Sequence, residues 1–305
     1  MDNNYIVGLK LKPQRQKKKV WAWILLLILV AIGISGVFKR SPELISPLSR
    51  INNSLRNIVD ESLTGARGTY GIAIKNLKSG ESYYFNEHRV FETGSLYKLW
   101  IMATVFKQIQ DGGLTEDQVL SEDIAALNEK FNIDPDSAEL KEGTVTLTVH
   151  DALLQMIAIS HNYAALLLTE KVKLSSVAAF LKENGFSESS VGTDGDPPKS
   201  TPADIALFYE RLYKGELANQ QYTQEMADLL KNQQSDDGLP KYLPDEVPVA
   251  NKTGDIGWFK HDAGIIYTGN GDYIITIMSE SDYPPGAQER IAMISKEVYE
   301  YFTKK

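Results

Sequence analysis

The sequence predicts an α/β protein of the α+β type, in which one antiparallel five-stranded sheet is built from both chain ends and flanked by helices. Two strand-like segments lie early in the domain and three lie late, whereas the segments between them have a helical period. The middle of the chain is therefore expected to form an all-helical insertion. A long apolar run near the N-terminus predicts one transmembrane helix before this domain.

Residues 20–38 form an apolar run of 19 residues, which as a helix spans about 28 Å, close to the thickness of a bilayer core. Residues 1–40 carry a net charge of +7. The positive-inside rule then predicts a cytoplasmic arm at 1–19, a single-pass anchor in the cell membrane at 20–38 and an extracytoplasmic domain at 39–305. A cleaved signal peptide and a buried core helix are the alternatives. The first would have a small-residue cleavage site, and the second rarely carries a flanking lysine block.

The first half of the domain begins with an apolar helical period over 45–63. Strands are predicted at 68–74 and 82–85, with a turn at 76–80 between them. A helix is predicted over 95–110, where Gly112 and Gly113 follow its end. Residues 121–143 are polar and are expected to be irregular.

The second half is marked by strong helix boundaries. Thr148 opens a helix with Asp151 as its capping-box partner, and another helix begins at Ser175 and stops before Gly185. Thr201, followed by proline, begins a third helix. The remaining predicted elements are strands at 249–253, 263–268 and 273–279, a tight turn at 269–272 and an amphipathic helix at 287–302.

Composition excludes several classes of function. Cysteine is absent, so the chain has no disulfide, thiolate metal site or cysteine nucleophile. The net charge of −8 becomes −15 for residues 41–305, which argues against a nucleic-acid-binding surface. The four histidines show no metal-binding spacing, and no nucleotide-binding fingerprint is present. No metal and no cofactor are expected.

Ser95 and Lys98 are the first candidate catalytic pair. Residues three positions apart share one face of a helix, so the amine can reach the hydroxyl. A hydroxyl becomes a good nucleophile when a base accepts its proton, and lysine is such a base once burial or another cation lowers its pKa. Taken alone, the pair is more often a capping serine and a solvated lysine.

Two further motifs lie later in the chain. The Ser-His-Asn triplet at 160–162 separates two apolar helical stretches, and alone it fits a helix–helix turn. The Lys-Thr-Gly triplet at 252–254 ends a predicted strand, where it could bind a carboxylate and allow close approach of a ligand. Alone, a lysine on an edge strand more often prevents aggregation.

Together the three motifs occur once each, in the order Ser-x-x-Lys, Ser-x-Asn and Lys-Thr-Gly. This is the set found in class A β-lactamases and penicillin-binding proteins. The chain resembles this family of penicillin-recognising serine hydrolases over about residues 45–303. Residues 91–95, 200–204 and 262–266 also resemble family segments that flank these motifs.

The resemblance implies an acyl-enzyme at Ser95, formed with β-lactams or with related D-alanyl-D-alanine wall peptides. Lys98 would accept the proton of Ser95, directly or through water, and Ser160 would pass a proton to the leaving nitrogen. Asn162 would hold Lys98 and the substrate amide.

The same resemblance implies a substrate-binding strand with Lys252, Thr253, Gly254 and Asp255. Lys252 would attract the substrate carboxylate and Thr253 would hydrogen-bond it. The backbone amides of Ser95 and Asp255 would form the oxyanion hole.

The chain departs from the family at the loop that carries the water-activating glutamate of class A enzymes. Asp194 and Asp196 are the nearby carboxylates, and beside Gly and Pro they are more often turn residues. Losing a general base typically costs about 10²–10⁴-fold in rate, so slow deacylation is expected. His161 replaces the more usual aspartate, and Asp255 places a negative charge near the carboxylate site.

Three functions remain open on these observations. The chain is expected to be a serine hydrolase of the β-lactamase type. A D,D-peptidase or penicillin-binding protein with slow deacylation is the first alternative. A non-catalytic, membrane-tethered domain that binds or senses the cell wall is the second.

Overall fold

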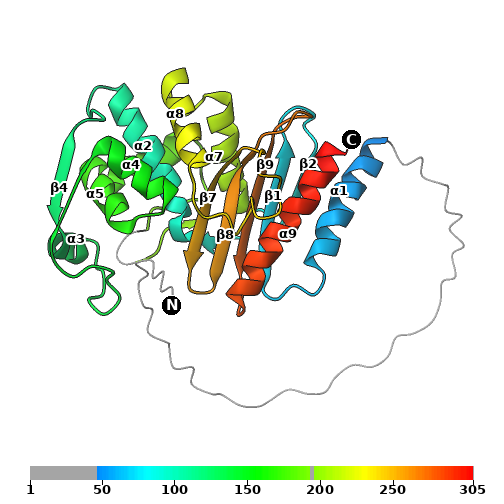
Figure 1. Ribbon diagram of the computed structural model, residues 1–305, viewed down its shortest axis with the longest axis horizontal. Helices are drawn as coiled ribbons and strands as arrows, with labels where there is room; N and C mark the ends of the chain where they lie inside the picture. The colour runs from blue at the N-terminus through cyan, green and yellow to red at the C-terminus, as the bar shows by residue number, and fades with distance from the viewer. Residues whose placement is uncertain (1–46, 193–195, 305) are drawn as a thin grey trace, which may run out of the picture.

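A five-stranded antiparallel sheet forms the centre of the protein (Figure 1). The structure is a computed structural model that describes residues 47–192 and 196–304. The strand order is β2-β1-β9-β8-β7, and the strands are β1 (Thr69–Asn76), β2 (Ser82–Phe85), β7 (Val249–Ile256), β8 (Phe259–Ile266) and β9 (Tyr273–Glu280). Strands from both chain ends therefore meet at the β1–β9 pair, which confirms the predicted sheet.

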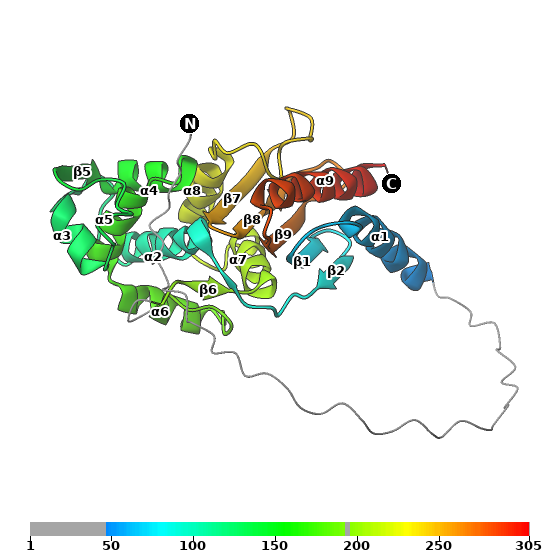
Figure 2. The same cartoon turned by 90° about the horizontal axis from the view of Figure 1, so that it is seen from below.

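Helices cover both faces of this sheet. On one face lie α1 (Pro47–Leu63) and α9 (Pro284–Thr303), whose buried residues share a core with β1 and β9. On the other face lies α7 (Pro202–Lys214), so that α9 and α7 sit on opposite sides of the strands in Figure 2. The apolar residues of β9 alternate between these two cores, as expected for a central strand with two buried faces.

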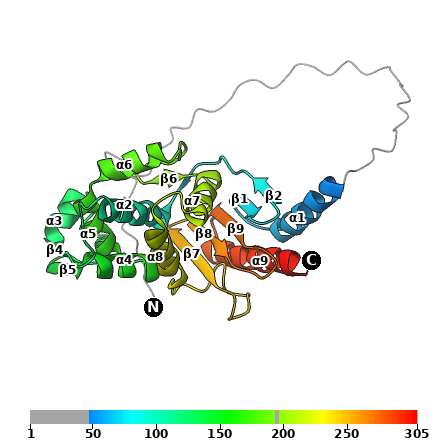
Figure 3. The ribbon, with the colours of Figure 1, turned by 90° about the horizontal axis from the view of Figure 1, so that it is seen from above.

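A mostly helical region lies beside the sheet (Figure 3). A short 3₁₀ helix, η1 (Gly94–Tyr97), leads directly into α2 (Lys98–Gln110), a largely buried helix at the centre of this region. Around it lie α3 (Ile124–Lys130), α4 (Val149–Ala158), α5 (Asn162–Val172), α6 (Leu174–Glu183) and α8 (Gln220–Lys231).

The prediction of an all-helical insertion was wrong. Two small antiparallel ladders lie within it: β3 (Phe91–Glu92) pairs with β6 (Lys199–Ser200), and β4 (Val119–Asp123) pairs with β5 (Thr144–Thr148). The segment 121–143, predicted as irregular, also contains α3. Its N-cap is Asp123, whose carboxylate accepts a hydrogen bond from Ala126 N at 2.9 Å. Short strands and a one-residue cap give too weak a periodic signal to be recognised in so polar a sequence.

Several predicted boundaries were correct. Thr148 Oγ1 accepts a hydrogen bond from Asp151 N, and Thr201 caps α7 in the same way. Two strands extend further than predicted, because β7 reaches Ile256 and β8 begins at Phe259. Charged residues such as Asp255 and Lys260 interrupt the apolar pattern by which a strand is recognised. The hairpin between β7 and β8 was therefore not predicted.

The predicted membrane span at 20–38 lies outside the described residues, as does the arm before it. Among the residues that are described, no helix has both the length and the apolar character needed to cross a bilayer.

Candidate active site

Ser95 lies in η1, one turn before α2, at the junction between the sheet and the helical region. Its side chain is nearly buried, and within the described part of the chain Oγ has no hydrogen-bond partner. Ser95 nevertheless lines a cavity of about 330 Å³. A buried polar atom without a partner normally costs free energy, and at the floor of a cavity it is placed to react with a ligand.

Lys98 is the first residue of α2 and is fully buried. Its Nζ lies 2.6 Å from Ser160 O, 3.1 Å from Ser160 Oγ and 2.7 Å from Asn162 Oδ1. Burial, helped by the charge of Lys252, lowers the pKa of Lys98 well below its ordinary value, and Glu139 opposes this shift. The neutral amine, whose lone pair can accept a proton, is therefore favoured in this site more than in a solvated lysine.

Ser160 occupies the connection between α4 and α5 in a left-handed conformation, with φ of +58°. This conformation is unusual for a residue with a side chain and costs about 1–2 kcal/mol. It turns the carbonyl and the hydroxyl of Ser160 towards Lys98 Nζ. The chain then enters α5 through His161, whose ring Nδ1 accepts a hydrogen bond from Ala164 N at 3.0 Å and caps the helix.

Lys252 is also fully buried, and it approaches Ser160 from β7. Its Nζ lies 3.1 Å from Ser160 Oγ and 3.1 Å from Thr253 O. Burial lowers the pKa of Lys252 to about 7, and the nearby carboxyl of Asp262 acts in the opposite direction. The hydroxyl of Ser160 thus bridges two amines, and its single proton can be given to one while it accepts a proton from the other.

Gly254 allows β7 to pass close to η1. A Cβ on Gly254 would lie 2.4 Å from Thr93 O, and a Cβ on Gly94 would lie 2.8 Å from Asp255 N. Only glycine fits at these two positions. Their close contact brings the end of β7 next to η1, which carries Ser95. Thr253, Gly254 and Asp255 line the cavity together with Ser95.

Asp255 does not present an unpaired charge to the cavity. Its carboxylate forms an ion pair with Lys260, which lies directly opposite it on β8. The expected weakening of anion binding at this position is therefore offset by a neighbouring cation, which the sequence pattern did not indicate.

All eight predicted site residues lie in or directly against one cavity. It is lined by Ser95, Ser160, Asn162, Thr253, Gly254 and Asp255, with Lys98 and Lys252 buried behind Ser160. His161 lines it as well, and burial lowers the pKa of this ring, so the ring is neutral at neutral pH. Five of the lining residues were not predicted: Glu139, Ile159, Ser235, Asp237 and Gln288.

Of these residues, Glu139 forms a hydrogen bond with a motif residue. Its Oε1 accepts a hydrogen bond from Asn162 Nδ2 at 2.7 Å, while Asn162 Oδ1 accepts one from Lys98. Glu139 precedes Asn162 by 23 residues in a segment without periodic pattern. Only the folded structure brings the two together.

The loop before α7 contributes no residue to this cavity in its described part. Asp196 instead lines a different hollow beside α6, and Asp194 lies outside the described residues. Within the described part of the chain there is also no group of three or more His, Asp or Glu side chains arranged to hold a metal ion.

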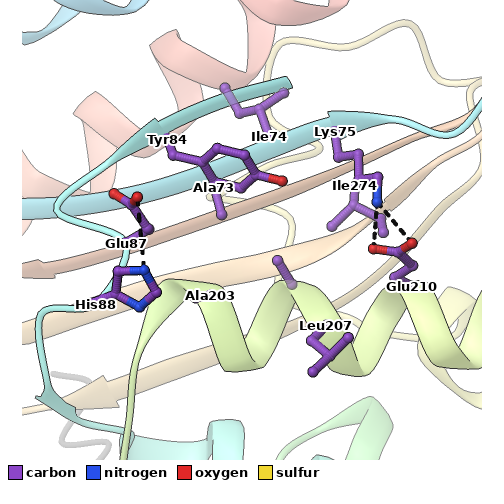
Figure 4. A pocket seen from close by; sticks show the side chains of 11 residues that line it. Ala73, Ile74, Lys75, Tyr84, Glu87, His88, Ala203, Leu207, Glu210 and Ile274 are labelled. Atoms are coloured by element: carbon purple, nitrogen blue, oxygen red, sulfur yellow. Dashed lines mark hydrogen bonds and ion pairs between the residues drawn. The ribbon is translucent and has the colours of Figure 1, made fainter. Parts of the chain in front are cut away.

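A second hollow of about 300 Å³ lies between the sheet and α7 (Figure 4). Its floor is apolar, and an ion pair between Lys75 and Glu210 lies at one end, with Glu87 and His88 at the other. It contains no hydroxyl beside a buried amine. A serine hydroxyl near buried amines lies instead in the cavity lined by Ser95 and Ser160.

Comparison with known proteins agrees with this geometry. The sequence profile described as "Beta-lactamase enzyme family" matches residues 51–302. No curated protein matches the chain. A β-lactamase from Sphaerobacter thermophilus DSM 20745 is 23% identical, with a TM-score of 0.72, over 83% of this chain and 98% of that one. PBP-A is 23% identical, with a TM-score of 0.73, over 83% of this chain and 97% of that one.

Proposed function

Because the chain belongs to the β-lactamase enzyme family, we propose that it is a serine hydrolase that forms an acyl-enzyme at Ser95 with β-lactams or with related D-alanyl-D-alanine wall peptides. The observation that carries the proposal is the pair of buried lysines joined through Ser160 Oγ beside the unpartnered hydroxyl of Ser95. A mutant of PBP-A that forms an acyl-enzyme complex with penicillin G has the same fold.

We propose an acylation step that uses these side chains. Ser95 Oγ attacks the carbonyl carbon of the scissile amide, and Lys98 accepts the hydroxyl proton, directly or through water. The backbone amides of Ser95 and Asp255 stabilise the oxyanion that forms. The C–N bond then breaks, and Ser160 passes a proton to the leaving nitrogen, which leaves an ester on Ser95. Lys252 in its charged form and Thr253 hold the substrate carboxylate.

Deacylation is proposed to be slow, as in a penicillin-binding protein. The ester must be attacked by water, and a carboxylate base normally speeds this step by about 10²–10⁴-fold. The described residues of the loop before α7 place no carboxylate in the cavity, which supports this part of the proposal.

Intact-protein mass spectrometry over several hours after exposure to benzylpenicillin tests the function. We expect a covalent adduct on the wild type that persists for longer than it takes to form. Ser95→Ala should form none, whereas Ser121→Ala, which removes an exposed hydroxyl on β4, should label like the wild type. Binding without an adduct would contradict the proposal and favour a non-catalytic wall-binding domain.

We also propose that residues 20–38 anchor the domain on the outer side of the cell membrane. The length of the apolar run and the basic arm before it support this location.

A further inference from the structure

Glu139 lies at the exposed side of the cavity, between α3 and β5. One carboxylate oxygen is held by Asn162 Nδ2 at 2.7 Å. The same amide group contacts Lys98 through its oxygen at 2.7 Å. The carboxylate is therefore fixed next to the residue that, under the proposed function, receives the amide on the acyl side of the substrate.

The charge around the cavity makes this carboxylate significant. Its described lining includes the acids Glu139, Asp237 and Asp255, and it includes no lysine or arginine. The carboxylate of Asp255 is already paired with Lys260. Lys98 and Lys252 lie beneath the lining, and burial lowers the pKa of both. The outer part of the cavity thus favours a positively charged group on the ligand.

We propose that Glu139 is a specificity-determining residue that selects acyl donors with an ammonium group close to the scissile amide. The natural donor would then be a wall peptide in which a free amine of a diamino acid lies on the acyl side of the scissile bond. This inference rests on the proposed function, because Asn162 must hold the substrate amide beside Glu139. A carboxylate and an ammonium at hydrogen-bond distance form a charge-assisted contact that a neutral substituent cannot make.

Three penicillins with the same nucleus provide the test. At the benzylic carbon, ampicillin carries an ammonium, benzylpenicillin a hydrogen and carbenicillin a carboxylate. Second-order acylation rates are measured by mass spectrometry at about pH 6.5, where the amine of ampicillin is charged. We expect the rate to be highest for ampicillin, intermediate for benzylpenicillin and lowest for carbenicillin. Ampicillin should exceed carbenicillin by about tenfold or more at low salt, and added salt should reduce this ratio by screening.

Glu139→Gln should bring the three rates close together, because the amide retains an oxygen for Asn162 but has no charge. Glu129→Gln removes one charge from the exposed surface of α3, so it controls for net charge and should keep the wild-type order. Equal rates for the three compounds on the wild type would overturn the inference, as would an unchanged order in Glu139→Gln. Absence of any adduct at Ser95 would instead overturn the proposed function.

Discussion

At the scale of single residues, the site depends on the unfavourable backbone of Ser160. Its φ of +58° is the conformation that glycine adopts most easily, yet the position holds a serine whose hydroxyl contacts both lysines. Strained residues persist where the surrounding structure holds them, and they concentrate at functional sites. The strained backbone at this position therefore lowers stability but places a hydroxyl between two amines.

A pair of substitutions separates the backbone of Ser160 from its hydroxyl. Ser160→Ala and Ser160→Gly should slow acylation to a similar extent, by about 10²-fold or more, because both remove the proton relay. Ser160→Gly should be more stable than Ser160→Ala by about 1 kcal/mol, since glycine adopts positive φ without strain. Benzylpenicillin labelling and urea unfolding measure the two effects. Equal stability of the variants would contradict the assigned strain.

The two lysines also predict a pH dependence. Lys98 accepts a proton only when it is neutral, so acylation should fall as pH decreases through its lowered pKa. Lys252 has a pKa of about 7 and attracts a carboxylate only when it is charged, so acylation of anionic substrates should fall as pH rises above that value. The outcome is a bell-shaped profile of acylation rate against pH.

The methyl ester of benzylpenicillin is the control for the alkaline limb. It lacks the carboxylate, so loss of the charge on Lys252 should affect it much less, and its rate should remain high above about pH 7. An identical alkaline limb for the acid and the ester would show that Lys252 does not act through the substrate carboxylate.

At the scale of elements, the contact between β7 and η1 sets the distance between the substrate-binding strand and the nucleophile. Gly254→Ala places a methyl group 2.4 Å from Thr93 O, so the strand must move away. A displacement of about 1 Å costs on the order of 10²-fold in rate. Gly269→Ala is the matched control, because no atom lies within 4 Å of its added Cβ. Labelling rates and thermal unfolding should show a large loss of rate for Gly254→Ala and little change for Gly269→Ala.

The same elements show what sequence reasoning could recover. The members of the pairs Ser95–Lys98 and Ser160–Asn162 are neighbours along the chain, so local spacing keeps each pair together, but their assignment to a catalytic site came from the family resemblance. Lys252 was associated with them only by family resemblance, since it lies on a strand far along the chain. Glu139 could not be found, because neither a periodic pattern nor a motif marks its segment, and its contact with Asn162 arises from tertiary packing alone.

At the scale of the whole molecule, the domain has its own cores, to which α1 contributes. Leu55 and Val59 of α1 are fully buried against residues of β1 and α9. Burial of such side chains stabilises a fold by about 1.5–3 kcal/mol each. We therefore expect the fold to require α1 and to form without the residues that precede α1.

Two truncations test this division. A chain beginning at residue 47 should fold, acylate at the wild-type rate and unfold within a few degrees of the full chain, since it retains α1. It should also appear in the soluble fraction of cells, whereas the full chain appears in the membrane fraction if residues 20–38 are an anchor. A chain beginning at residue 64 lacks Leu55 and Val59 and should lose about 3–6 kcal/mol, a large part of the stability of an ordinary domain. Recovery of the full chain in the soluble fraction would contradict the anchor, and normal folding without α1 would contradict its place in the core.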